Sequence, residues 1–354
     1  MAYLQGRNDS KGSRGNQNAM RKRKEKLAVF LVNLGTPDRP DAQSIRRYLA
    51  EFLSDRRVVN LPRLLWLPIL YGIILTLRPR KLVENYRFIW GEEDAPIRVY
   101  TRRLAASVMH IISRQHTRND LEVLDAMTYG NPSLDDAIAT AIAKGADDLL
   151  FIPLFPQYSS ATTAAVVDRI AKVFAGRFYI PSFRVVNSYY DHPKYIHALT
   201  KSLEQYSEQI ENGAKLIFSF HGIPLSLYKS GDPYPEQCKR TAEQVAYSLA
   251  LNETQWMMTF QSRFGPSEWL QPYTDITLSE LAAQGQKSVI VVCPGFASDC
   301  LETLEEINRE ARDIFLKTGG EEFTYVPALN DDEDHVALIS DIVMAHLYSD
   351  EMPE

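Results

Sequence analysis

The chain has 354 residues, of which 45% are hydrophobic and 24% are charged, and its formal net charge is -6. These values are typical of a globular protein with a full core, and they exclude the disordered, collagen-like and coiled-coil classes. At about 100 to 200 residues per domain, the length favours two domains. Three scattered cysteines cannot form a disulfide framework, which favours a reducing cytoplasm as the compartment.

The charge is divided unevenly along the chain. Residues 1–26 carry eight basic and two acidic side chains, a net charge of +6, and the remaining residues carry -12. Because this leading segment has almost no apolar side chains, we expect a disordered basic tail and not a secretory signal. Such a tail could touch nucleic acid or an anionic membrane, or it could be a solvated leader.

Beyond the tail, short apolar runs alternate with longer amphipathic segments. Continuous apolar runs of this length suit strands that are buried on both faces, as in a parallel sheet. The sequence predicts strands at 27–34, 122–128, 148–153, 182–187, 215–220, 255–261, 287–293 and 322–326. Helical periodicity predicts helices near 41–54, 81–90, 97–115, 133–144, 162–176, 192–210, 235–250, 274–284, 299–317 and 334–348.

The alternation of strands and helices predicts an α/β fold of two similar doubly wound domains, each with a parallel sheet flanked by helices. We place these domains at 27–180 and 181–330, followed by a C-terminal helix within 331–354 that packs back on the N-terminal domain. In both halves, strands run into turns rich in Gly and Pro, as at 33–37 and 221–224. Functional loops in this fold follow the carboxyl ends of the strands.

Residues 64–77 do not follow this alternation. They form a run of 14 almost uncharged residues that Pro68 and Gly72 interrupt. The run is shorter than the roughly 20 residues that a membrane-spanning helix needs. Three interpretations stay open: a buried core helix, an apolar lip of a hydrophobic pocket, or a patch that dips into a membrane.

The chain contains no GxxxxGK[ST], no GxGxxG after a strand, no HExxH and no CxxC motif, which argues against nucleotide-phosphate, dinucleotide, zinc-peptidase and thiol-redox chemistry. His221 is the most informative residue that remains, because it ends an apolar strand and Gly222 and Pro224 turn the chain directly after it. A neutral imidazole there can bind a metal or accept a proton near neutral pH. A histidine at a strand end can also be merely hydrogen-bonded.

A second strand of the same half leads into an acidic helix. Asp299, Glu302 and Glu306 follow the strand at 287–293, and the two glutamates lie four residues apart on one helical face. Carboxylates at this spacing repel each other unless a cation or protons lie between them, although the helix dipole alone also favours acids in a first turn. With His221 they make a plausible open N/O site for a divalent metal that is passed onward.

Aromatic residues gather in the same loops, and together with Leu34, Tyr129 and the 64–77 run they can wall a flat apolar cleft. Each of them alone also suits an ordinary core. They are Phe155, Tyr158, Phe220, Tyr234, Trp269, Tyr273 and Phe296.

Several motifs in consistent order over residues 27–348 resemble the ferrochelatase family. They are VNLGTP at 32–37, PQYS at 156–159, FSFHGIP at 218–224, GDPYP at 231–235, FQSRFGPxxWL at 260–270 and PGFxSDxLETL at 294–304. The resemblance implies a chelatase-like fold with the active-site cleft between the two domains. It also implies insertion of Fe2+ into protoporphyrin IX to form protohaem, the last step of haem synthesis.

By position, His221 and Glu302 match the family's active-site histidine and facing glutamate, which hold iron or take the pyrrole protons. The resemblance leaves open which of His221 and Glu302 holds iron and which takes the protons. Glu306 and, more loosely, Asp299 match the acidic line along the helix that is proposed to carry protons or metal. The 64–77 run matches the lip that admits the macrocycle and faces the membrane.

The porphyrin-binding positions implied by the resemblance are apolar or aromatic. Leu34, Tyr129 and Trp269 match pocket-wall positions, and we assign Tyr158 and Phe296 to porphyrin binding with them. The chemistry of metal insertion agrees with these assignments. The porphyrin ring must lose two N–H protons and pucker toward the metal, and it needs walls that hold the bent ring.

The chain departs from some family members at two points. Cys300 stands two residues before Glu302, where some ferrochelatases have a second histidine, so a metal relay through that position is not expected. Other members bind a [2Fe-2S] cluster through four cysteines, largely in a C-terminal extension; with three cysteines in a chain that ends at Glu354, we expect no cluster.

The expected partners are protoporphyrin IX and Fe2+ as substrates, with no nucleic acid. We expect a cytoplasmic protein, monomer or homodimer, with peripheral membrane contact through the 64–77 lip. Two alternatives stay open: a chelatase for coproporphyrin or a corrinoid, and a non-catalytic porphyrin or haem carrier, which would need the walls but not the carboxylates.

Overall fold

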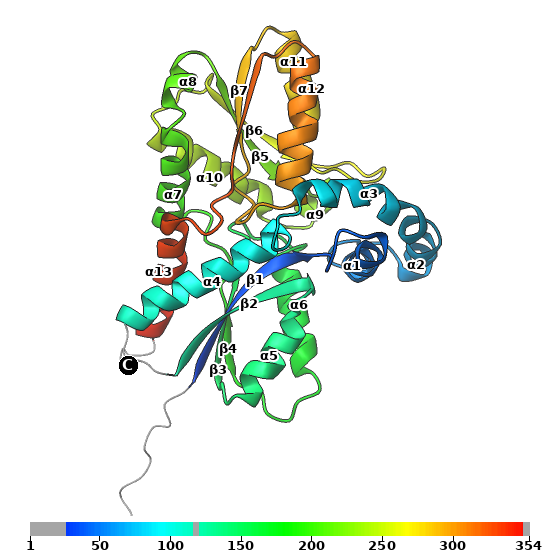
Figure 1. Ribbon diagram of the computed structural model, residues 1–354, viewed down its shortest axis with the longest axis vertical. Helices are drawn as coiled ribbons and strands as arrows, with labels where there is room; N and C mark the ends of the chain where they lie inside the picture. The colour runs from blue at the N-terminus through cyan, green and yellow to red at the C-terminus, as the bar shows by residue number, and fades with distance from the viewer. Residues whose placement is uncertain (1–25, 116–119, 350–354) are drawn as a thin grey trace, which may run out of the picture.

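The computed structural model describes residues 26–115 and 120–349, so the predicted basic tail lies outside the described residues except for Lys26. Two four-stranded parallel sheets form the frame (Figure 1). The first contains β1 (Leu27–Thr36), β2 (Leu121–Gly130), β3 (Asp148–Pro153) and β4 (Ser182–Val185). The second contains β5 (Lys215–His221), β6 (Trp256–Gln261), β7 (Ser288–Val292) and β8 (Glu322–Val326).

The two sheets have the same topology. Their strand orders are β2-β1-β3-β4 and β6-β5-β7-β8, and all neighbouring strands within each sheet are parallel. All eight predicted strands are present, with ends that differ by no more than two residues. The prediction of a two-part α/β fold with parallel sheets is therefore confirmed.

The predicted boundary at residue 180 needs correction. It falls before β4, but β4 pairs with β3, from Asp148↔Ser182 to Phe151↔Val185. The connection through α6 (Thr163–Phe174) returns the chain to the same sheet, as expected of a strand–helix–strand unit. The first sheet therefore ends after residue 185.

Helices cover the faces of both sheets. The predicted helices are present as α1 (Ala42–Ser54), α3 (Leu75–Ile89), α4 (Pro96–Gln115), α5 (Leu134–Ala143), α6, α10 (Tyr234–Ser248), α11 (Thr274–Ala283) and α13 (Glu333–Ser349). The predicted helix at 192–210 is two helices, α7 (Pro193–Glu204) and α8 (Ser207–Glu211). The one at 299–317 begins as a π-helix, η2 (Glu302–Ala311), and continues as α12 (Arg312–Lys317). A short α9 (Leu225–Lys229) was not predicted.

One continuous apolar core joins the two sheets. It contains Leu31 and Ile152 of the first sheet together with Phe218 and Ile290 of the second, and residues of α4, α7, α10 and α13 complete it. The outer face of each sheet has its own core beneath its own helices. Because the inner core is shared, the carboxyl ends of the two sheets hold a fixed position relative to each other.

The C-terminal helix α13 lies between the two halves. It contacts α4 of the first half and α7 of the second (Figure 1). Lys201 Nζ donates to Asp334 Oδ2 at 2.6 Å across the contact with α7. The expected packing on α4 is thus present, and α13 binds the second half as well.

The 64–77 run forms α2 (Arg63–Ile69), the short π-helix η1 (Leu70–Ile74) and the start of α3. Trp66, Leu70 and Leu75 are buried, whereas Leu64 is 91% exposed. Other apolar side chains of the run that are also exposed are Leu65, Ile69, Tyr71, Ile73 and Leu77. The interpretation as a buried core helix is therefore wrong for most of this segment, which presents an apolar lip to solvent.

Candidate active site

The site lies where strands of both sheets end. His221 is the last residue of β5, and the chain from the end of β7 runs through 293–301 into η2. Parallel strands present their carboxyl ends at one edge, so these two segments are neighbours. His221 and Glu302 line the same cleft, together with Leu34 of β1 from the other half.

The imidazole of His221 has a defined tautomer. Its Nδ1 lies 2.6 Å from the carbonyl oxygen of Gly222, and since a carbonyl can only accept, Nδ1 carries the proton. In the neutral imidazole the other ring nitrogen, Nε2, then bears the lone pair that can bind a metal or accept a proton. Gly222 is required at the turn, because a Cβ there would lie 2.9 Å from the carbonyl oxygen of Gln261.

Glu306 is held by the residue that follows β6. The backbone N–H of Ser262 donates to Oε1 of Glu306 at 2.7 Å, and the Ser262 hydroxyl donates to Oε2. Ser262 adopts a positive φ of 66°, which turns both donors toward the carboxylate. Burial raises the pKa of Glu306, the Ser262 bonds and the neighbouring His221 lower it, and the charge of Glu302 raises it again. Glu306 therefore interacts electrostatically with both His221 and Glu302, and we call these three residues the electrostatic group.

The π-helix itself is tied to the sheet by Gln261. Its side-chain Nε2 donates to the backbone carbonyl of Glu302 at 3.0 Å, and its Oε1 accepts from the Ser219 hydroxyl at 2.8 Å. A π-helix has i→i+5 bonds, and such turns often occur at functional sites. Here the widened turn keeps Glu302 and Glu306 in electrostatic contact with each other.

Asp299 is engaged in a structural network. Its Oδ1 accepts from Thr303 Oγ1 at 2.9 Å and from the hydroxyl of Tyr325, and its Oδ2 accepts from Asn330 Nδ2 at 2.8 Å. The side chain is buried and does not line the cleft. The prediction that Asp299 lies on a proton or metal path is therefore not supported by the geometry, because both of its carboxylate oxygens accept hydrogen bonds that fix the loop before η2.

The predicted wall residues divide into two groups. Leu34, Trp269 and Phe296 line the cleft, and the Phe296 ring centroid lies 6.3 Å from that of His221. Tyr129 and Tyr158 do not line it.

Tyr129 and Tyr158 lie behind the wall. Tyr129 is buried under the lip, donates its hydroxyl to Asp55 Oδ2 at 2.8 Å, and packs edge-on against Phe52, which does reach the cleft. Tyr158 is half-buried, and its backbone N–H donates to Gln237 Oε1 at 2.7 Å. The prediction that these two tyrosines form the wall is not supported by the geometry.

Several lining residues had no signal in the sequence. Phe52 and Val58 come from α1 and the loop after it, and Ile97 comes from the first turn of α4. Their apolar character matches any helix core, so no local pattern separates them from core residues. Phe155 and Tyr234, noted as loop aromatics, also line the cleft.

Two buried polar atoms in this apolar wall have no protein partner. Gln157 Oε1 and Ser298 Oγ both belong to residues that line the cleft, and neither has a hydrogen bond within the described residues. Buried polar atoms are normally paired, so unpaired ones at a cleft are available to a bound molecule.

Cys300 also lines the cleft, beside Glu302. Burial raises the pKa of its thiol, and the neighbouring Glu302 carboxylate raises it further. The thiol is therefore protonated at neutral pH and is a weak metal ligand. Among the described residues no three His, Cys, Asp or Glu side chains are grouped so that they could hold a metal ion.

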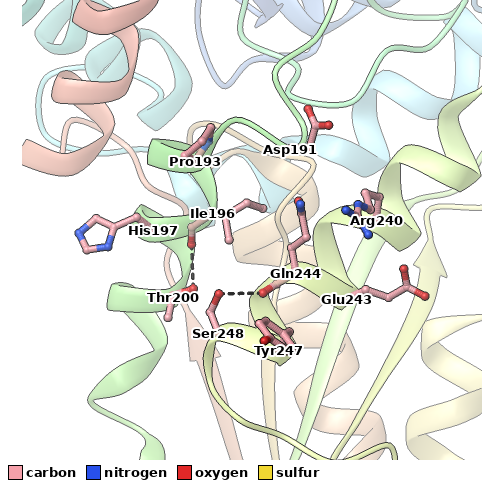
Figure 2. A pocket seen from close by; sticks show the side chains of 10 residues that line it. All are labelled: Asp191, Pro193, Ile196, His197, Thr200, Arg240, Glu243, Gln244, Tyr247 and Ser248. Atoms are coloured by element: carbon pink, nitrogen blue, oxygen red, sulfur yellow. Dashed lines mark hydrogen bonds between the residues drawn. The ribbon is translucent and has the colours of Figure 1, made fainter.

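A larger hollow lies elsewhere, between α7 and α10, with a volume of about 690 Å³ (Figure 2). Its polar side chains do not converge: His197 and Glu243 point away from each other. The Thr200 and Ser248 hydroxyls donate to backbone carbonyls one turn earlier, at Ile196 and Gln244. Volume alone therefore does not make this groove the reactive site.

Fold and site together define a two-sheet α/β protein with an apolar cleft and a histidine–carboxylate group at its end. The ferrochelatase family model matches residues 26–347. Ferrochelatases of Vibrio parahaemolyticus and Yersinia enterocolitica are each 45% identical to this chain over 92% of its length and 99% of their own. The chain belongs to the ferrochelatase family and is an enzyme of that family.

A solved structure shows the same fold at low identity. The protein titled SirB from Bacillus subtilis with Fe3+ is 12% identical, with a TM-score of 0.50 over 90% of this chain and 94% of that one. At this identity the likeness concerns the fold alone.

Proposed function

We propose that this chain inserts Fe2+ into protoporphyrin IX to form protohaem. The observation that carries the proposal is the pairing of His221 and Glu302 in one apolar cleft, with Glu306 in electrostatic contact with both residues. The family supports the reaction class, and the cleft supports a flat apolar substrate.

Deprotonation and metal delivery need different groups. A free-base porphyrin must lose two N–H protons as the metal enters, so the site needs a proton acceptor of near-neutral pKa. In the neutral ring, His221 Nε2 can accept a proton, and Glu306, whose pKa burial raises, can take the proton onward. We assign Glu302, which lines the cleft with His221, to iron. The Fe2+ then enters from the histidine–carboxylate end of the cleft.

The walls favour a dicarboxylate porphyrin over a polycarboxylate. Leu34, Phe52, Trp269 and Phe296 present apolar surface, and the exposed lip continues it outward. A dicarboxylate porphyrin has an apolar edge that matches this surface, whereas a porphyrin with four carboxylates would place buried charge against it.

The alternatives are separated by a direct assay. Insertion of Fe2+ or Zn2+ should be measured with protoporphyrin IX and coproporphyrin III side by side, and with Co2+ on a corrinoid precursor. A higher kcat/KM for coproporphyrin III would replace the proposed substrate. Porphyrin binding without any metal insertion would favour the carrier alternative.

Replacement of His221 by Ala tests the proposed mechanism. Loss of a positioned general base costs about 100-fold to 10,000-fold in rate. We expect such a loss of metal insertion in His221→Ala, with porphyrin binding, read by tryptophan quenching, within about threefold of the parent. His197→Ala, an exposed histidine of α7, is the matched control. Unchanged insertion in His221→Ala would remove this residue from the mechanism.

We also propose peripheral membrane contact through the lip. Leu64, Leu65 and Ile73 expose apolar side chains. The buried residues of the same segment share a core with Leu34 and Phe52 of the cleft, so a hydrophobic substrate would enter near the lip. Within residues 26–115 and 120–349, no helix is long and apolar enough to span a bilayer. Contact of this kind suits a cytoplasmic enzyme, monomer or homodimer, that takes porphyrin at a membrane surface.

A further inference from the structure

The loop between β3 and α6, residues 154–162, forms part of the cleft wall, and we name it the wall loop. It joins two elements of the first half, which lie in the lower part of Figure 1, whereas α10 belongs to the second half above it. The residues of the wall loop that line the cleft are Leu154, Phe155, Gln157, Ser159, Ala161 and Thr162. The position of this loop therefore determines where one wall of the cleft stands.

Consecutive residues of the wall loop bond to polar side chains at the start of α10. Asp232 Oδ2 accepts from the Ser159 hydroxyl at 3.1 Å and from the Ser160 backbone N–H at 2.7 Å. The backbone N–H of Tyr158 donates to Gln237 Oε1 at 2.7 Å. The PQYS motif of the first half and the GDPYP motif of the second are therefore partners across the boundary between the halves.

The amide of Gln157 is oriented by Thr241 on the same helix. The Thr241 hydroxyl gives its single hydrogen to a backbone carbonyl, that of Tyr190 at 2.8 Å or that of Gln237 at 3.1 Å. It can therefore only accept from Gln157 Nε2, which lies 3.0 Å away. Gln237 and Thr241 are four residues apart and so share one face of α10. This face, together with Asp232 before it, holds the wall loop residue by residue.

Asp232 makes the contact that involves an ionisable group. The residue is 7% exposed, and its Oδ1 accepts from the Tyr234 backbone N–H at 3.1 Å. Tyr234 also lines the cleft, so one carboxylate connects lining residues of both halves, Ser159 and Tyr234. Hydrogen bonds to an ionised acceptor contribute more than bonds between neutral groups. An amide in this place would have one acceptor oxygen, so the backbone N–H of Ser160 or of Tyr234 would lose its partner.

We propose that Asp232 is a positioning residue for porphyrin binding, which fixes the wall loop of the first half against α10 of the second. The inference rests on the proposed function, because it takes a porphyrin as the occupant of the cleft. A rigid flat ring contacts both walls only at a matching separation, since a gap of about 0.5 to 1 Å already removes a quarter to a half of the dispersion attraction. A wall that is fixed before the ring enters needs less ordering on binding.

Asp232→Asn in the full chain tests this proposal. A displaced wall weakens binding of the substrate and of the transition state alike, so the porphyrin KM rises while kcat does not change. We expect the KM for protoporphyrin IX in Zn2+ insertion, and its Kd from tryptophan quenching, to rise about tenfold. The kcat and the KM for Zn2+ should stay within about twofold of the parent. Partial unfolding alone would instead lower the apparent kcat and leave KM unchanged.

Two further variants make the test specific. Glu236→Gln is the matched control, because Glu236 is exposed in the first turn of the same helix and bonds to Tyr228; its constants should stay within about twofold of the parent. Thr241→Val removes the acceptor of Gln157 at nearly constant volume and should raise the porphyrin KM about threefold. If Asp232→Asn does not fold, as judged by circular dichroism, Thr241→Val decides the outcome.

A double-mutant cycle links the effect to the wall loop. Ser159→Ala and Asp232→Asn remove the same hydrogen bond, so their combined effect on the porphyrin Kd should be smaller than the product of the single effects. Independent, multiplicative effects would overturn the proposal, as would an unchanged porphyrin KM and Kd in the folded variants, or a fall in kcat without a change in KM. A parent chain that binds no protoporphyrin IX would contradict the proposed function and this inference together, which distinguishes the two failures.

Discussion

Glu305 provides a quantitative test of the electrostatics around the π-helix. Its side chain is only 8% exposed, and Arg309 lies 3.9 Å away on the same helix. Burial raises the pKa of Glu305 from 4.5 to about 7, with further contributions from Glu310 and the lowering effect of Arg309. The folded state therefore binds the proton more tightly than the unfolded chain, and stability is lost as the pH rises from about 4.5 through 7.

Glu305→Gln removes this titration while keeping the size of the side chain. The full pKa difference corresponds to about 3 kcal/mol, of which about 2 kcal/mol falls between pH 5.5 and pH 8.5. We therefore compare the free energies of unfolding of Glu305→Gln and the parent at each pH. The difference should be about 2 kcal/mol more in favour of the variant at pH 8.5 than at pH 5.5. Urea unfolding at the two pH values measures this difference, and the difference cancels changes in hydrogen bonding that do not depend on pH.

Glu253→Gln, at an exposed turn, is the control and should show no such difference. An equal effect of Glu305→Gln at both pH values would show that Glu305 ionises normally in the folded state. A loss of stability confined to pH 8.5 would show that the ionised side chain stabilises the contact between η2 and α3. Either outcome would refute the reasoning from burial.

Other perturbations test the remaining geometry. Ser262→Ala removes one of two bonds to Glu306 and should raise the pKa of that carboxyl; we expect kcat to fall about tenfold with porphyrin affinity retained, measured over a range of pH. Gly35→Ala places a Cβ 1.7 Å from the Tyr129 carbonyl oxygen at a φ of 110°, and should lower the free energy of unfolding by about 3 kcal/mol or more in denaturant titration. The three cysteines are buried with raised pKa values, so Ellman's reagent should react slowly with the folded chain and fast in urea. The purified protein should lack iron–sulfur absorption; a stoichiometric cluster would contradict this.

The sheets were predictable because burial on both faces leaves a strong local signal. The run at 215–220 is apolar almost throughout, and β5 is buried between two layers of helices. His221 was predictable for a related reason, since a polar residue at the carboxyl end of such a strand, followed by Gly222, must leave the sheet at its functional edge.

Asp299 shows where local patterns fail. Acids at the start of a helix look the same whether they serve a ligand or the protein itself. The partners of Asp299 are Thr303, Tyr325 and Asn330, and the last two follow it by 26 and 31 residues through β8 and the turn beyond it. Only the tertiary structure brings those donors to the carboxylate.

Tyr129 and the lip show a second kind of failure. Tyr129, the last residue but one of β2, pairs with Gly35. Its hydroxyl reaches Asp55 at the end of α1, and this direction depends on the position of a residue 74 positions earlier in the chain. In the lip, Leu64 and Leu70 are chemically alike, but one is exposed and the other buried. The sequence contains no information on that difference until the packing of α1 and η1 is known.

The two halves have one topology but contribute different chemistry to the cleft. The C-terminal half supplies the polar residues of the cleft, His221 and Glu302, with Glu306 in electrostatic contact with both, whereas the N-terminal half supplies apolar wall from Leu34 and Phe52. An apolar wall opposite the polar group lowers the local dielectric, which strengthens the interaction of a cation with the carboxylates and also favours their protonation when no cation is present. The same arrangement can therefore take up the two protons that leave the porphyrin nitrogens and pass them to solvent as the cation enters, as a reaction that exchanges two protons for one divalent cation requires.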